Sequence, residues 1–229
     1  MVAKALFITG TDTEIGKTEV TLGLMAAIQK RGHRVLGMKP IASGAEPTED
    51  GLRNDDALRI QRQGSLDIAY PMINPYAFEP PIAPHLAAKE AGVELDFQQI
   101  HNNLNILSRQ ADYVIVEGVG GWKVPLGING GVAEMTLTLG LPVVMVVGLR
   151  LGCINHALLT AESIISSGCH FIGWIANAVD SDMAVQQENI STLERELPAP
   201  LLGKIDHMTE PSTETVMDNL SNIDWIDYL

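Results

Sequence analysis

Residues 10–18, Gly-Thr-Asp-Thr-Glu-Ile-Gly-Lys-Thr, have the composition of a loop that binds nucleotide phosphates. They follow the apolar run 5–8 and precede a helix-like stretch, 20–30. In such loops backbone N–H groups and the helix N-terminus hold the anion, a lysine reaches the terminal phosphates, and a threonine hydroxyl binds Mg²⁺. Lys17 and Thr18 occupy the positions for the last two roles. The two glycines lie one residue further apart than in the usual motif, which indicates a particular subset of nucleotide enzymes.

A second lysine, Lys39, ends another apolar run and is followed by a turn that Pro40 and Gly44 favour. If this run is a strand of the same sheet, Lys39 enters the crevice that holds the phosphates, although a solvated loop lysine is the ordinary alternative. Asp55 and Asp56 come next, at the start of a helical pattern. Taken alone, this acidic pair is best interpreted as a helix N-cap.

Glu117 ends the apolar run 113–116 and is followed by a glycine-rich segment, 118–121. A carboxylate in this position is typical of the second metal-binding element of enzymes with a phosphate loop. A buried glutamate without a cation would be costly, whereas Mg²⁺ prefers oxygen ligands and keeps several waters. We therefore expect Glu117 to bind Mg²⁺ together with Thr18 and the phosphate oxygens.

Two further polar segments also follow apolar runs. Residues 148–156, Gly-Leu-Arg-Leu-Gly-Cys-Ile-Asn-His, lead into a helix whose first N–H groups could hold a substrate carboxylate, although Asn155 alone is better explained as an N-cap. Asn177 follows the run 171–176. Its side-chain amide offers both a donor and an acceptor, as recognition of an adenine edge requires.

These side chains require a parallel sheet that brings the ends of its strands together. Apolar runs without polar alternation predict strands buried on both faces, at 5–9, 34–39, 113–117, 143–147, 171–176 and 201–205. Helical patterns lie between them, most clearly at 17–30, 97–110, 155–167 and 183–196. The alternation predicts a doubly wound α/β sheet flanked by helices, like that of P-loop NTPases, in a single domain over 1–229. Ligands of such sheets bind at the carboxyl ends of the strands, where all of these polar segments fall.

Residues 40–84 depart from this alternation. They are rich in Pro, Gly, Asn and Asp, and only 56–63 has a helical pattern. A long irregular segment inside a compact fold is usually functional or disordered, so we expect it to contribute loops to the binding crevice or to lack fixed structure.

The chain is acidic, with a formal net charge of −13, which argues against nucleic acid or an anionic membrane as a partner. A hydrophobic fraction of 46% with 19% charged residues is ordinary for a globular protein. Cys153 and Cys169 are too few for a disulfide scaffold, and the apolar run 141–149 is too short to span a membrane. Because the chain also opens without a signal-peptide pattern, we expect a cytoplasmic protein.

Six short motifs follow one another along the chain. They are Gly-Thr-Asp-Thr-x-x-Gly-Lys-Thr at 10–18, Lys-Pro-x-Ala-Ser-Gly at 39–44, Gly-Leu-Arg-Asn-x-Asp at 51–56, Val-Glu-Gly-x-Gly-Gly-Trp at 116–122, Gly-Cys-Ile-Asn-His-Ala at 152–157 and Pro-Ala-Pro-Leu-Leu-Gly at 198–203. Together they closely resemble the bacterial dethiobiotin synthetase family. This resemblance implies a homodimeric, ATP-dependent ligase of biotin biosynthesis that uses MgATP and CO₂ to close a ureido ring on 7,8-diaminononanoate.

The resemblance also implies a role for each matching residue. Lys39 would be the main catalytic lysine, with Lys17 and Thr13 beside it, and Asp56 becomes a metal ligand instead of a cap. The Mg²⁺ ligands would be Thr18, Asp56 and Glu117. The nucleotide would contact Glu14, Ile15, Gly16, Lys17, Thr18, Glu19, Asp56, Glu117, Gly118, Val119, Gly120 and Asn177. The substrate would contact Ser43 and, in the neighbouring subunit, the amides of Gly152, Cys153, Ile154 and Asn155.

These residue types suit the reaction that the resemblance implies. One amine of the substrate captures CO₂ as a carbamate, a carbamate oxygen attacks the γ-phosphoryl group, and the second amine then closes the five-membered urea. The reaction requires positive charge more than a protein nucleophile, and Lys17, Lys39 and Mg²⁺ supply that charge. Since no histidine is required, His85 and His156 are interpreted as structural.

Two other interpretations, and one departure from the family, accompany this assignment. A nucleotide-switch ATPase of the partitioning or septum-positioning type would carry a second lysine where this chain has Asp12, and a basic amphipathic C-terminal helix where this chain has an acidic segment around Asp224. A related amidoligase is the other alternative. Asp206 stands where the family commonly has a proline near the base, so the mode of base recognition stays open.

Overall fold

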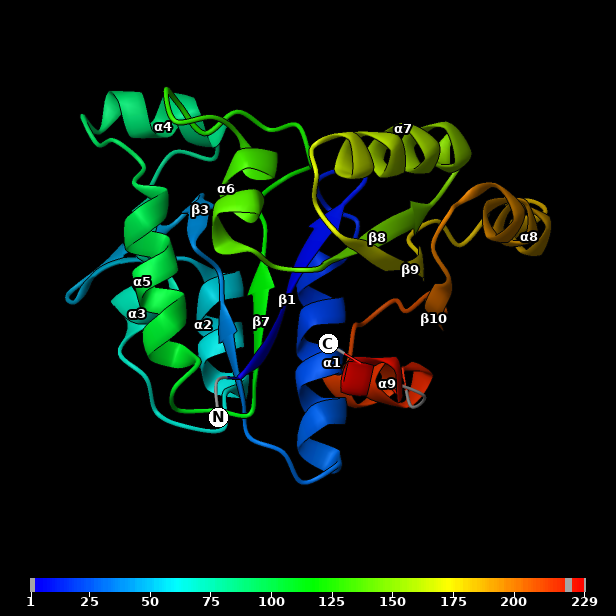
Figure 1. The fold of residues 1–229 in the computed structure, drawn as a ribbon, viewed down its shortest axis with the longest axis horizontal. Coiled ribbons are helices and arrows are strands. Elements are labelled where there is room, and N and C mark those ends of the chain that lie inside the picture. Colours follow the sequence, from blue (N-terminus) through cyan, green and yellow to red (C-terminus); the bar gives the residue numbers. More distant parts are fainter. Residues whose placement is uncertain (1–2, 221–223, 229) are drawn as a thin grey trace.

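A six-stranded sheet forms the centre of the computed structural model, which describes residues 3–220 and 224–228 (Figure 1). Its strand order is β10-β9-β8-β1-β7-β2, and every neighbouring pair runs parallel. The strands are β1 (Lys4–Gly10), β2 (Val35–Met38), β7 (Tyr113–Glu117), β8 (Val143–Leu149), β9 (Phe171–Ala178) and β10 (Leu201–Ile205). The predicted doubly wound α/β sheet is confirmed, and each predicted strand lies where the apolar runs placed it.

The strands at the centre of the sheet are buried on both faces, because their runs of Val, Ile and Leu leave no polar side. Every residue of the central strands β7 and β8 is buried, as is every residue of the edge strand β2, whereas the other edge strand, β10, is mostly half-buried. β1 lies between β7 and β8, and its register sets Ile8 beside Glu117. The phosphate loop and Glu117 therefore leave the sheet at the same edge.

Helices flank the sheet, and α1 packs against both α2 and α9 (Figure 1). In chain order the helices are α1 (Lys17–Lys30), α2 (Asp55–Gln63), α3 (Tyr70–Ile73), α4 (Pro84–Glu90), α5 (Phe97–Leu107), α6 (Val132–Leu139), α7 (Cys153–Ser166), α8 (Gln186–Glu196), α9 (Thr213–Asn219) and a short 3₁₀ helix, η1 (Asp224–Tyr228). Within the described ranges, no helix has the length and apolar character that crossing a membrane requires.

The segment 40–84 has more regular structure than the sequence predicted. β3 (Ile41–Ser43) pairs in parallel with β6 (Tyr76–Phe78), and β4 (Glu46–Thr48) forms a hairpin with β5 (Gly51–Arg53). The buried amide of Asn74 fixes the start of this segment, because its Nδ2 donates to the carbonyl oxygens of Lys39, at 2.6 Å, and Tyr76, at 3.3 Å. Strands of three residues are too short to show a periodic pattern, so these four could not be predicted from the sequence.

Candidate active site

A cavity of about 740 Å³ opens at the carboxyl edge of β1, β2 and β7. Its walls are the phosphate loop, the turn after β2, the first turn of α2 and the segment after β7. The residues predicted from sequence that line this cavity are Thr13, Glu14, Gly16, Lys17, Thr18, Glu19, Lys39, Ser43, Asp56, Glu117, Val119 and Gly120. The topology therefore gathers into one cleft most of the side chains that the motifs singled out.

The phosphate loop turns sharply between β1 and α1. Gly16, at the N-cap of α1, has a φ of +80°, a left-handed conformation that glycine adopts without strain. The side chain of Ile15 is buried, and it lies so close to Gly10 and Gly148 that neither position has room for a Cβ. Ile15 thus anchors the loop through its side chain, and a nucleotide can meet it only through its backbone.

Replacing Gly16 with alanine should abolish tight nucleotide binding. A Cβ on Gly16 would lie 2.2 Å from Asn177 Nδ2, which itself donates to the carbonyl oxygen of Ile15 at 2.8 Å. Relieving the clash would break this bond, and strain at positive φ adds to the cost, so we expect ATP affinity to fall about 10- to 100-fold in isothermal titration. Gly32 is a matched control, with a φ of +84° and open space around its Cβ. An equal loss of affinity in Gly32→Ala, or none in Gly16→Ala, would contradict this account.

Lys17 is buried at the base of the loop, where its Nζ donates to the carbonyl oxygen of Asp12 at 2.7 Å. Burial lowers the pKa of Lys17 to about 8, although the nearby Glu117 carboxylate opposes the shift. An anion beside the ammonium would favour its charged form. The position of Lys17 is therefore suited to a phosphate group that enters the cleft.

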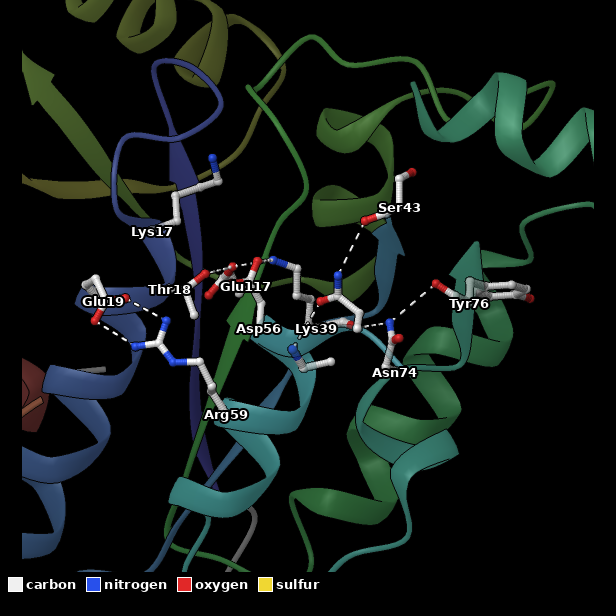
Figure 2. A network of polar contacts seen from close by, with 12 residues as sticks. Lys17, Thr18, Glu19, Lys39, Ser43, Asp56, Arg59, Asn74, Tyr76 and Glu117 are labelled. Carbon is white, nitrogen blue, oxygen red and sulfur yellow. Dashed lines mark hydrogen bonds and ion pairs between the residues drawn. The ribbon is translucent and has the colours of Figure 1, made fainter. Parts of the chain in front are cut away.

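A compact cluster of charged and polar groups lies on the floor of the cleft (Figure 2). The Nζ of Lys39 lies 2.5 Å from Asp56 Oδ2 and 2.7 Å from Glu117 Oε1. Thr18 donates its hydroxyl to the same Glu117 Oε1 at 2.8 Å. Glu117 is fully buried and Lys39 is only 6% exposed, so these charges interact in a region that is largely shielded from water.

The charges of Lys39 and Asp56 stabilise each other. Burial opposes the charge on Lys39, but Glu117 and Asp56 outweigh it, and the pKa of Lys39 is raised above its usual value. Burial likewise opposes ionisation of Asp56, yet the ammonium of Lys39 holds the pKa of Asp56 below its usual value. Lys39 therefore carries a positive charge and Asp56 a negative one at neutral pH. The solvated-lysine alternative for Lys39 is wrong, because the side chain is buried between two carboxylates.

The N-cap of α2 is Asn54, and the interpretation of Asp55 and Asp56 as the cap is therefore wrong. The Oδ1 of Asn54 accepts from the backbone N–H of Ala57 at 3.2 Å. Its own N–H donates to the hydroxyl of Tyr70 at 2.8 Å, which fixes where the helix begins. With the cap supplied by Asn54, the side chain of Asp56 is free to turn into the cleft toward Lys39.

The oxygen atoms of this cluster are suitable ligands for a hard divalent cation. Thr18, Asp56 and Glu117 offer oxygen atoms only, which is the ligand type that Mg²⁺ prefers. Glu117 Oε2 is buried and has no hydrogen-bond partner among the described residues, so a strong acceptor there is left for a cation or a bound water. Among residues 3–220 and 224–228, no three His, Cys, Asp or Glu side chains are placed so that together they could hold a metal ion. A site with two carboxylates therefore needs phosphate oxygens or waters to complete it.

Ser43 lies on the wall of the cleft opposite the phosphate loop, at the end of β3. Its Oγ is buried and has no hydrogen-bond partner within residues 3–220 and 224–228, although its carbonyl oxygen accepts from Asn54 Nδ2 at 3.3 Å. An unpaired buried hydroxyl that lines a cavity is available to a ligand. This geometry suits the substrate contact expected of Ser43.

Asn177 lines a second, smaller cavity of about 220 Å³. This cavity adjoins the phosphate loop and is lined by Glu14, Gly16, Glu19, Asn177, Ala178, Val179, Asp206, His207, Met208 and Pro211. One function of the Asn177 amide is structural, because it holds the carbonyl oxygen of Ile15. Asp206 directly follows β10 and lines the same cavity. This position agrees with its expected place near the base of the nucleotide.

The segment after β8 contacts the phosphate loop through a charged pair. Arg150 forms an ion pair with Asp12, so the aspartate links the loop to the β8–α7 turn. α7 begins at Cys153 with Gly152 as its N-cap, and the interpretation of Asn155 as the cap is therefore wrong. The Cys153 N–H donates to the carbonyl oxygen of Arg150 at 3.0 Å, whereas helix geometry directs the next amides, of Ile154 and Asn155, beyond the helix start.

Two ion pairs next to the cleft were not predicted from the sequence, Arg150–Asp12 and Arg59–Glu19. The partners lie 138 and 40 positions apart in the chain. No spacing rule connects residues at such distances, and each charge by itself has the pattern of a solvated helix or loop residue. A signal existed only for Asp12, since an acidic residue is unexpected in a loop that holds phosphates.

Comparison with known proteins gives close relatives over nearly the whole chain. A family model described as "AAA domain" matches residues 4–215. A protein of Pseudomonas aeruginosa (strain LESB58) named "ATP-dependent dethiobiotin synthetase BioD" is 50% identical over 217 residues, 94% of this chain and 95% of the relative. A protein of the same name from Cellvibrio japonicus (strain Ueda107) is 48% identical over 220 residues, 96% of each chain. "ATP-dependent dethiobiotin synthetase BioD 1" of Salmonella typhi is 47% identical over 88% of this chain and 89% of its own.

Solved structures with a similar fold are more distant in sequence. The MinD cell division protein of Aquifex aeolicus superposes with a TM-score of 0.58 at 16% identity, covering 95% of both chains. A ParA family ATPase from Chlorobium tepidum TLS gives a TM-score of 0.55 at 15% identity, covering 96% of this chain and 90% of the other. At such identities the likeness concerns the fold alone, and it confirms the predicted P-loop NTPase-like architecture.

Proposed function

The chain belongs to the ATP-dependent dethiobiotin synthetase family, and from this premise we propose how its cleft closes a ureido ring on 7,8-diaminononanoate at the expense of ATP. As a member of this family it is an ATP-dependent ligase of biotin biosynthesis. The observation that carries the residue assignment is the convergence of Lys17, Lys39 and the unpaired hydroxyl of Ser43 on one cavity. Two buried cations suit a reaction between two anions, a carbamate and a triphosphate.

We propose the following sequence of bond changes. One amine of the diamine adds to CO₂ and loses a proton, which gives a carbamate. A carbamate oxygen attacks the γ-phosphorus of ATP, the bond to the β-phosphate oxygen breaks, and ADP leaves. The second amine attacks the carbonyl carbon of the resulting carbamic-phosphoric anhydride. The bond from that carbon to the oxygen that carries the phosphoryl group breaks, and inorganic phosphate leaves. Loss of the remaining amine proton completes the five-membered urea.

Lys39 and Lys17 would act as fixed positive charges on this path. The ammonium of Lys39 contacts both metal-site carboxylates, and the carbamate would form beside it, on the side of the cleft that carries Ser43. Lys17 would contact the β- and γ-phosphates from the base of the loop, with Thr13 beside it on the cavity wall. Preorganised charges that stabilise the transferring group lower the barrier without reorganisation of solvent.

Thr18, Asp56 and Glu117 would hold Mg²⁺. The bound ion supplies Lewis-acid stabilisation of negative charge on the phosphate oxygens. The residues that surround the nucleotide would be Glu14 to Glu19, Glu117 to Gly120 and, near the base, Asn177. Backbone N–H groups of the loop and the start of α1 add partial positive charge at the same place.

A homodimer would complete the substrate site. The turn that holds Arg150 to Ile154 is absent from the walls of the main cavity, so within one subunit these amides are not placed to hold a substrate there. Leu151, next to them, is 96% exposed, and Leu137 and Leu159 of α6 and α7 are also exposed. A second subunit that covered these apolar side chains would remove them from water. In a dimer, the amides of Gly152 to Asn155 would hold the substrate carboxylate of the neighbouring site, in a cytoplasmic enzyme.

The product assay tests this function. Purified protein is incubated with 7,8-diaminononanoate, bicarbonate and MgATP, and dethiobiotin and ADP are measured by mass spectrometry. We expect equimolar dethiobiotin, ADP and phosphate, all dependent on the diamine. Phosphate release that is indifferent to the diamine would contradict the proposal and would favour a nucleotide-switch ATPase.

A further inference from the structure

A bidentate ion pair joins α1 to α2 beside the proposed metal site. The Nη1 of Arg59 lies 2.7 Å from Glu19 Oε1, and its Nη2 lies 2.9 Å from Glu19 Oε2 (Figure 2). The side chain of Glu19 is 15% exposed and that of Arg59 is 30% exposed. A planar fork that meets both oxygens of a partly buried carboxylate fixes orientation as well as distance, which a single surface contact does not.

Each partner of this pair adjoins an expected metal ligand. Glu19 directly follows Thr18 in the first turn of α1. Arg59 lies three positions after Asp56 on α2, so the two side chains share a face of that helix. The pair therefore spans the same gap between helices that separates the Thr18 hydroxyl from the Asp56 carboxylate.

Polar contacts hold α2 in place more than apolar packing does. The helix has nine residues, and of these only Ala57 and Ile60 are buried apolar ones. Metal ligands must be held to within about 0.5 Å of their productive positions, and a short helix with little apolar packing depends on polar links for that precision. At the far end of the same two helices, Gln29 and Gln63 form a second link, in which each side chain donates to the other residue at 2.7 Å.

We propose that the Arg59–Glu19 pair is a positioning clamp, which sets the distance between the Thr18 hydroxyl and the Asp56 carboxylate and so the affinity of the site for a divalent cation. The proposal rests on the metal role of Thr18, Asp56 and Glu117 proposed above. Arg59 is a positioning residue in this proposal, which acts through the metal ligands Thr18 and Asp56.

The test compares Arg59→Ala with Gln63→Ala in the full chain. Gln63→Ala removes the bond from Gln63 Nε2 to Gln29 Oε1 at the far end of the same helices, and it serves as the matched control. Binding of Mn²⁺ is measured by electron paramagnetic resonance in the presence of a non-hydrolysable ATP analogue. We expect the Kd for Mn²⁺ to rise about tenfold in Arg59→Ala, which is the usual size of an effect transmitted to a ligand by its supporting shell. Gln63→Ala should leave the Kd within the error of wild type.

Further measurements exclude a general loosening of the structure. Arg59→Lys keeps one contact to Glu19 and should give an intermediate Kd, and turnover of Arg59→Ala should recover when Mg²⁺ is raised. Affinity for the ATP analogue without metal should not change. The proposal is overturned if Arg59→Ala binds Mn²⁺ normally, if Gln63→Ala is equally weakened, or if metal-free nucleotide affinity falls instead. If Glu117→Gln leaves Mn²⁺ binding unchanged, the metal site itself is refuted and the clamp with it.

Discussion

Replacing Lys39 with methionine should lower turnover about 100- to 1,000-fold, the usual cost of removing one group that stabilises charge in a transition state. The ammonium lies between Asp56 and Glu117 at the side of the cleft assigned to the carbamate. Methionine keeps most of the volume of the lysine but removes its charge. Lys17 still faces the phosphates in this variant, so ATP affinity should stay within a few-fold of wild type.

Steady-state kinetics with diamine and ATP, together with isothermal titration of ATP, separate these two quantities. Lys30→Met is the matched control, because Lys30 also pairs with a carboxylate, Asp218, but on the exposed surface. That variant should retain normal turnover, since exposed ion pairs contribute little. If Lys39→Met lost ATP affinity in proportion to its turnover, Lys39 would be a nucleotide-binding residue and its catalytic role would be wrong.

Replacing Glu117 with glutamine should weaken metal binding and turnover together. Glu117 is fully buried, Thr18 and Lys39 both donate to its Oε1, and its Oε2 lacks a partner within the described residues. An amide of the same shape removes the charge that a divalent cation requires and brings a donor toward Lys39. We expect Mn²⁺ affinity, and turnover at fixed Mg²⁺, to fall about 100-fold, at the upper end of effects on metal sites.

Mn²⁺ titration by electron paramagnetic resonance checks this expectation. Glu194→Gln makes the same chemical change on the exposed surface of α8 and should behave as wild type. Thermal unfolding without metal should show that Glu117→Gln is folded, because the remaining Lys39–Asp56 pair still satisfies the ammonium. A Glu117→Gln protein with normal Mn²⁺ affinity would remove Glu117 from the metal site.

The strands of the sheet could be predicted because two-sided burial requires unbroken apolar runs, and those runs are visible in the sequence. β7 and β8 show this most clearly, since every residue in them is buried. The short strands β3 and β6 could not be predicted in the same way. They form because the buried amide of Asn74 bonds to the backbone around them, and such contacts leave no periodic pattern.

The position of the cleft could also be predicted, because ligands of a parallel sheet bind where its strands end. The precise role of single residues could not. Asp56 by itself has the pattern of a helix cap, and only the family resemblance made it a metal ligand. The structure shows that Asn54 takes the cap position and leaves Asp56 facing Lys39. The ion pair between Arg150 and Asp12 depends on two loops that meet only after the sheet has formed. Sequence patterns locate such a site, but its internal contacts depend on the tertiary packing.

Transfer of an oxygen atom from bicarbonate to phosphate tests the central proposal most directly. The reaction is run with ¹⁸O-labelled bicarbonate, 7,8-diaminononanoate and MgATP, and it is stopped before the label exchanges with water. If a carbamate oxygen attacks the γ-phosphorus in this cleft, each inorganic phosphate that accompanies a dethiobiotin will carry one ¹⁸O atom, visible as a mass shift. Unlabelled phosphate formed together with dethiobiotin would contradict phosphoryl transfer to the carbamate, and with it the proposed roles of Lys39 and Lys17.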